Sequence, residues 1–284
     1  MKLRTIWHKK SLLSLLAIAA SVCLIWLATT NQIQTALLNI TSMSRDPVVS
    51  REIVYSSRCL TNLQQQKYPA ALVSCRQAVK INPDNTEAHL NLGLTHFRLE
   101  QYQQAITQYQ FVLEQNPDEY RASYNWGLVN AAQGNYQEGI EHYNQALTAS
   151  EIGRKEQAMI LNDLGAAHIM LRQYQTAIAN LARAIELDSS SLASYFNRGC
   201  AYHHQGNYSA GIDDFSRVIA LDPNYTEAYI SRAILHHLVR QERLAYEDLD
   251  VVLEHYQGKG DRAAYQKIIG LKNSMVVARA RQTA

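Results

Sequence analysis

From residue 52 onward the sequence repeats a 34-residue pattern, and this period constrains the fold more than any other feature. The most regular copy is residues 86–119, TEAHLNLGLTHFRLEQYQQAITQYQFVLEQNPDE. Apolar side chains recur at helical spacing in both halves, and Asn116-Pro117-Asp118 ends the second helix because proline lacks an amide hydrogen. Neither helix can bury its apolar face alone, so the stretch needs neighbours like itself. Matching blocks begin at residues 52, 86, 120, 158, 192 and 226.

Each block keeps the same residue types at fixed positions, counted from the first residue of the block. Position 8 is small in all six blocks and position 20 is Ala or Gly, which allows two helices to approach closely. Position 17 is Tyr in the first five blocks, and position 32 is Pro in three of them. A period of 34 residues with these features predicts helical hairpins stacked one on the next.

This pattern resembles the tetratricopeptide repeat (TPR) family, and the resemblance covers residues 52–259. It implies an all-α fold, a right-handed superhelical solenoid of TPR helix hairpins. The third block carries four extra residues near Ser150 and lacks the proline, so we expect a longer second helix or a bulging loop there. The six repeats are expected at residues 52–85, 86–119, 120–157, 158–191, 192–225 and 226–259.

The N-terminus predicts attachment to a membrane. Residues 1–10 are basic, and residues 11–28 are uncharged and mostly apolar, nearly the length that spans a bilayer. We interpret 11–28 as an uncleaved transmembrane signal anchor and 29–51 as a spacer. The basic end would stay cytoplasmic, which puts the repeats on the non-cytoplasmic side, in a periplasm or lumen. The alternative is a cleaved leader and a secreted soluble binding protein, although Ala28-Thr29-Thr30 is a poor cleavage site.

After the repeats, residues 260–284 are expected to form a capping helix and a tail. A solenoid needs a terminal element with a polar outer face to cover its exposed core. Glutamine-rich helices together with an N-terminal anchor resemble those of bacterial, in particular cyanobacterial, TPR proteins.

Charge and motifs exclude several classes of function. Without the four basic residues of the first ten, the chain holds 23 basic and 25 acidic side chains, which argues against nucleic acid as the partner. The sequence lacks Gly-x-Ser-x-Gly, His-Glu-x-x-His and a phosphate-binding glycine loop, so we expect no enzyme activity and no cofactor. A third hypothesis, a metal site formed by Cys200, His203, His204 and His237, is weaker because only three ligands would converge easily.

The TPR resemblance also implies where a partner binds. In the family, positions 2, 5, 6, 9, 12 and 13 of the first helices line the concave face and contact extended or helical peptides. The residues that we assign to this peptide-binding groove are Leu90, Asn91, Leu94, Phe97, Arg98, Arg121, Tyr124, Asn125, Leu128, Asn162, Asp163, Phe196, Asn197 and His203.

Position 6 holds Asn91, Asn125, Asp163 and Asn197, and such a row can bond to a peptide backbone without reading its side chains. Alternatively, these residues only tie neighbouring hairpins together. The groove is otherwise largely apolar, which favours an apolar helix or strand as ligand. Alternatively, the C-terminal helix or the spacer folds back into it. The Lys, Asn and Arg clamp of chaperone-binding TPRs is present only as a fragment.

Cys59 and Cys75 occupy positions 8 and 24 of the first block, where the two helices of a hairpin face each other. In an oxidising compartment they could form a disulfide, provided that their Cα atoms lie within about 7 Å. The alternative is two buried thiols that replace the usual small and bulky residues. The sequence as a whole predicts a membrane-anchored scaffold that binds a protein or peptide client for complex assembly, with the client and the oligomeric state left open.

Overall fold

The structure, a computed structural model, describes residues 47–282, all of them in helices or in the connections between helices. The predicted basic end, the anchor and most of the spacer lie outside these residues. Within the described part of the chain, no helix combines the length and the apolar character that crossing a bilayer requires.

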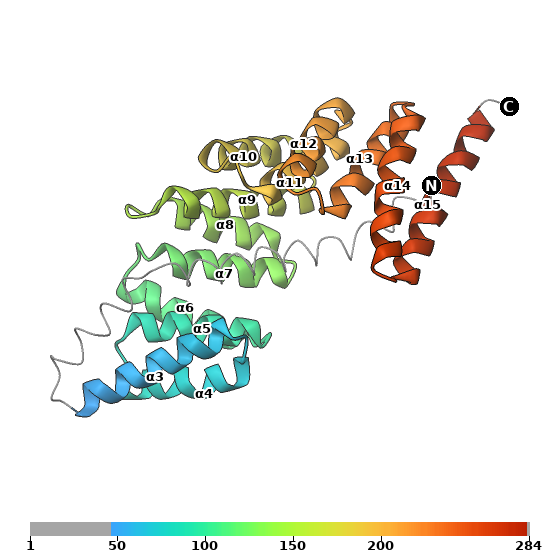
Figure 1. Ribbon diagram of the computed structural model, residues 1–284. Helices are drawn as coiled ribbons and strands as arrows, with labels where there is room; N and C mark the ends of the chain where they lie inside the picture. The colour runs from blue at the N-terminus through green and yellow to red at the C-terminus, as the bar shows by residue number, and fades with distance from the viewer. Residues whose placement is uncertain (1–46, 283–284) are drawn as a thin grey trace. The chain divides into compact units, whose positions relative to one another are not determined.

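The described residues form thirteen helices (Figure 1). In chain order these are α3 (Pro47–Gln64), α4 (Tyr68–Ile81), α5 (Thr86–Arg98), α6 (Tyr102–Gln115), α7 (Tyr120–Ala132), α8 (Tyr136–Leu147), α9 (Arg154–Met170), α10 (Tyr174–Leu187), α11 (Leu192–Gln205), α12 (Tyr208–Leu221), α13 (Thr226–Leu238), α14 (Glu242–Gly258) and α15 (Arg262–Gln282). Each odd-numbered helix from α3 to α13 packs against the helix that follows it, which gives six hairpins. The predicted all-α array of helix hairpins is confirmed.

The chain divides into two compact units, residues 1–153 and 154–284, and each is described by itself. In unit 1, α4 packs on α5 and α6 on α7, so that the first helices α3, α5 and α7 also lie in contact along one face. In unit 2 the same relation joins α10 to α11 and α12 to α13, with α9, α11 and α13 in contact. The last helix, α15, packs on α14 through Ile268 and Met275.

The turn inside every hairpin is built in the same way. Position 15 adopts a positive φ in all six blocks, between 56° and 85°, and the helix that follows begins at position 17. Gly134 and Gly206 take this left-handed conformation at little cost, whereas the other four blocks use Gln, Glu or Arg. The recurrent tyrosine of position 17 is therefore the first residue of the second helix in five hairpins.

Close packing between the two helices of a hairpin explains the small residues at position 8. A Cβ added at Gly93 would lie 2.5 Å from Cε1 of Tyr109, and one at Gly127 would lie 2.5 Å from Cε1 of Tyr143. Both tyrosines are buried and sit at position 24 of their blocks. The glycines therefore leave the space that the bulky side chain of position 24 fills.

The four extra residues of the third block do not lengthen its second helix. α8 has 12 residues, a loop follows, and α9 begins at Arg154, four residues before the position where the next block starts. Ser150 in the loop donates hydrogen bonds from its amide (3.3 Å) and its hydroxyl (2.7 Å) to Oδ2 of Asp118. The insertion thus forms a fixed loop and an extended first helix.

Candidate binding face

The first helices of unit 1 present a row of half-buried side chains that matches part of the predicted groove. Leucine occupies position 9 on all three helices, as Leu60, Leu94 and Leu128, and asparagine occupies position 6 as Asn91 and Asn125. These five side chains are neither sealed in the core nor fully exposed. Because α3, α5 and α7 are in contact, the five residues form one face, which we call the binding face.

The asparagines of the binding face retain their hydrogen-bonding capacity. Among the described residues, no hydrogen bond forms to the side-chain amide of Asn91 or of Asn125. An asparagine amide offers two donors and a carbonyl acceptor. Two such groups on neighbouring helices, beside apolar leucines, suit an extended backbone or the polar edge of a helix.

Position 6 has a different role in unit 2, where Asp163 and Asn197 are buried and both bond to Asn162, which occupies position 5 of the fourth block. Asn197 donates to Oδ1 of Asn162 (3.0 Å), and Asn162 donates to Oδ1 of Asp163 (3.0 Å). Ser194 also donates to Oδ1 of Asn162 (3.4 Å), and all four side chains are at most 7% exposed. This network joins α9 to α11, so here the asparagines tie neighbouring hairpins together.

Position 5 belongs to the core in both units. Leu90, Tyr124 and Phe196 are 4%, 2% and 2% exposed, and each packs against the second helix of its own hairpin or a neighbouring one. Phe97 lies half-buried against Tyr102. The guanidinium of Arg98 lies over the ring of Phe97 at the edge of the binding face.

Arg121 is neutralised by carboxylates of this chain. Its Nη1 lies 2.9 Å from Oε2 of Glu87, and its Nε lies 2.8 Å from Oε1 of Glu119. The hydrogen bond to Glu119 and the negative charges of both glutamates raise the pKa of Arg121 above its usual value. The arginine is therefore held within the array and is poorly placed to receive an acidic peptide tail.

The structure does not support the hypothetical metal site formed by the cysteine and the histidines. Cys200 is buried, and burial raises the pKa of its thiol to about 12, which disfavours the thiolate that a metal needs. His203 and His204 stack on each other, and His204 also stacks on Tyr174. The ring of Tyr208 lies tilted against His203, and His237 bonds to Glu242 at 2.8 Å. Across residues 47–282, no group of three His, Cys, Asp or Glu side chains could hold a metal ion.

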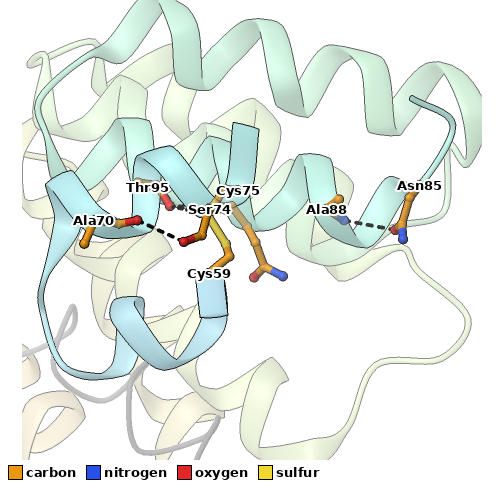
Figure 2. Close-up of a disulfide and its surroundings, with 8 residues drawn as sticks. Cys59, Ala70, Ser74, Cys75, Asn85, Ala88 and Thr95 are labelled. Carbon is orange, nitrogen blue, oxygen red and sulfur yellow. Dashed lines mark hydrogen bonds between the residues drawn. A yellow bond between two sulfur atoms is a disulfide. The ribbon is translucent and has the colours of Figure 1, made fainter. Parts of the chain in front are cut away.

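A disulfide joins Cys59 of α3 to Cys75 of α4, with the Cα atoms 4.9 Å apart (Figure 2). It fills the place that a glycine and a tyrosine occupy in the hairpins α5–α6 and α7–α8. Both cysteines are at most 1% exposed, and the hydroxyl of Thr95 on α5 lies 3.2 Å from Sγ of Cys75. The bond therefore cross-links the first hairpin directly beneath the helix that carries Asn91 and Leu94.

Leu60 is a member of the binding face that does not belong to the predicted groove. The predicted groove contains residues of the second to fifth blocks only, although the same register places leucine at position 9 of the first block. Applying the repeat to all six blocks would have found it.

Helical hairpins stack one on the next, and their first helices carry a face that is both polar and apolar. Such an arrangement is typical of helical-repeat proteins that bind a partner. Models of the tetratricopeptide repeat match residues 90–151 and 193–225, and a TPR repeat model matches residues 62–100. These stretches of the chain, residues 62–151 and 193–225, are therefore TPR repeats. A search of the curated proteins gave no significant match.

Several solved structures share this fold at low sequence identity. PilW, titled a widely conserved type IV pilus biogenesis factor, is 15% identical with a TM-score of 0.68 over 77% of this chain and 98% of its own. The pilF protein of Pseudomonas aeruginosa is 15% identical with a TM-score of 0.67 over 80% of this chain and 100% of its own. YrrB, titled a TPR protein with an unusual peptide-binding site, is 21% identical with a TM-score of 0.55 over 68% of this chain and 96% of its own.

Proposed function

We propose that this chain is a non-catalytic adaptor at a membrane, which holds an extended or helical segment of a client protein on the binding face for complex assembly. The observation that carries the proposal is the contrast between the two units. In unit 2, Asn197 donates to the buried Asn162. In unit 1, Asn91 and Asn125 keep their amides available beside three half-buried leucines.

The chemistry of the binding face suits a peptide backbone with apolar side chains. The asparagine amides can donate to a backbone carbonyl and accept from a backbone amide, which fixes a segment without selecting its sequence. The leucines gain free energy when a ligand covers them, at about 25 cal/mol per Å² of apolar surface. Structurally similar proteins support this class of function, since YrrB is titled for its peptide-binding site.

Attachment to the membrane and a non-cytoplasmic location form part of the proposal. The basic residues 1–10 and the apolar residues 11–28 favour an anchor, and the disulfide between Cys59 and Cys75 favours an oxidising compartment. The alternative is a secreted soluble protein with a cleaved leader. N-terminal sequencing of the mature protein separates the two, because a chain that begins near residues 29–35 supports only the second.

Replacing Asn91 and Asn125 together with alanine is expected to reduce client capture at least tenfold while leaving the fold intact. Both side chains lie at the surface of the array without protein partners among the described residues, so their loss costs binding rather than packing. The measurement is affinity purification of the full chain from membranes of its own cells, with bound proteins quantified by mass spectrometry. The matched control replaces Gln110 and Asn144, two exposed amides on the second helices, with alanine. Equal loss in both variants would contradict the assignment of the face.

A further inference from the structure

The second helix of every hairpin carries an outward stripe at positions 22, 25 and 29, and the six stripes can be compared directly. Residues three and seven apart share one side of a helix, so the three positions point the same way. On α4 the stripe is Val73, Arg76 and Lys80, and all three side chains are exposed. We call these three residues the α4 stripe.

The α4 stripe has a composition that the other second helices lack. In chain order the equivalent residues are Thr107, Gln110 and Glu114, then Glu141, Asn144 and Thr148, then Ala179, Ala182 and Glu186, then Asp213, Ser216 and Ala220, then Glu247, Asp250 and Glu254. The other five stripes hold seven acidic residues and no basic one. The difference is therefore local to the first hairpin and not a property of the repeat.

The net charge of the first hairpin also differs in sign from that of the rest of the repeats. Residues 47–81 hold five basic side chains and one acidic one, a net charge of +4, whereas residues 82–284 hold 17 basic and 23 acidic ones, a net charge of −6. All five basic side chains are exposed, and none of them takes part in the ion pairs of the described residues. Their charge is thus available to a partner.

Two exposed valines lie among these cations. Val73 is 64% exposed between Arg76 and the start of α4, and Val54 is 45% exposed between Arg51 and Arg58 on α3. Exposed apolar side chains among basic ones are typical of surfaces that rest in the boundary between lipid headgroups and acyl chains. An acidic protein surface would match the charge but would leave the valines without a stated role.

We propose that the α4 stripe, together with the exposed Arg58 of α3, docks on a membrane surface that carries anionic lipid headgroups. The inference rests on the membrane attachment in the proposed function. α3 begins at Pro47, and the 18 residues between residue 28 and α3 can span at most about 60 Å, which keeps the first hairpin within reach of the bilayer. Docking would hold the hairpin against the membrane and leave the binding face for the client.

Lysine labelling of the full chain in vesicles tests this docking. The chain is reconstituted with its repeats outside, into vesicles of phosphatidylcholine alone or of equal parts phosphatidylcholine and phosphatidylglycerol. Acetylation by an impermeant reagent is then followed at each lysine by mass spectrometry. We expect labelling of Lys80 to be roughly fivefold slower on the anionic vesicles, with recovery at high salt, whereas Lys155 of unit 2 reacts at one rate on both.

Variants separate docking by the stripe from general charge. Arg58→Gln with Arg76→Gln should abolish the protection of Lys80, whereas Arg183→Gln with Arg217→Gln, exposed positions on α10 and α12, should preserve it. Equal labelling of Lys80 on the two vesicle types overturns the proposal and leaves the stripe to an acidic protein. If alkaline extraction strips the chain from both vesicles, the anchor has failed. In that case the same comparison with vesicles added to the soluble chain still decides whether the stripe binds anionic lipid.

Discussion

Replacing Asp214 with alanine is expected to lower the free energy of unfolding of unit 2 by about 3 kcal/mol. Asp214 on α12 accepts two hydrogen bonds from Arg198 on α11, from Nη2 (2.7 Å) and from Nε (2.8 Å). The carboxylate side chain is only 6% exposed and its partner 20%, so alanine would leave a largely buried guanidinium without its counter-charge. Urea denaturation, followed by hydrogen exchange in α11 and α12, measures the change.

Two matched variants identify the cause of this loss. Arg198→Met with Asp214→Leu removes both charges and should recover most of the stability, because no unpaired charge remains. Glu247→Ala breaks the Arg243–Glu247 pair, whose side chains are 78% and 54% exposed, and should cost no more than about 0.5 kcal/mol. A loss at Asp214 as small as that at Glu247 would show that the buried pair contributes little.

Removing the disulfide by Cys59→Ser with Cys75→Ala is expected to destabilise unit 1 by about 3 kcal/mol. The bond closes a loop with a sequence separation of 16 residues, and a loop of this size restricts the unfolded chain by about that amount. The first hairpin lacks the Gly–Tyr contact of its neighbours. The disulfide joins α3 to α4 at the two positions where that contact would lie. Urea denaturation with and without reductant gives the measurement.

The disulfide also has an internal control. Reductant should destabilise the native chain and leave the double variant unchanged. It should also leave unit 2 unchanged, where Cys200 is a buried free thiol. If hydrogen exchange in α3 and α4 were the same before and after reduction, the bond would have no stabilising role.

The period of 34 residues predicted the hairpins because the two helices of each hairpin pack through the same positions in every block. Small residues at position 8 and bulky ones at position 24 are visible in the sequence, and the structure shows why, since Tyr109 and Tyr143 occupy the space that glycine leaves. The left-handed turn at position 15 was not predicted. Gln66, Glu100, Arg172 and Arg240 share its conformation without sharing a residue type that signals it.

The candidate site was only partly predictable, because the repeat fixes the positions of side chains but not their partners. Asn91 and Asn197 occupy the same register, yet one has an available amide and the other bonds to Asn162. In the preceding block, position 5 is Asn162 for Asn197, whereas it is Ser56 for Asn91 and Leu90 for Asn125. The buried Arg198–Asp214 pair escaped prediction for a similar reason, since arginine at position 7 replaces the leucine of the second block.

The anchor, the superhelical path of the whole array and the identity of the client stay predictions. The first two concern residues 1–46 and the relation between the two units. A TPR surface constrains the shape and polarity of the segment that it binds, but it does not identify the protein that carries the segment.

Photo-crosslinking from the binding face tests the central claim most directly. A benzophenone amino acid is placed at Leu94 on α5, or at Gln110 on the outward stripe of α6 as the matched control, in the full chain expressed in its own cells. We expect a discrete client adduct from position 94 that the Asn91→Ala and Asn125→Ala changes remove, and none from position 110. An adduct from position 110 alone, or one from position 94 that survives both alanine changes, would contradict recognition through the first helices of unit 1.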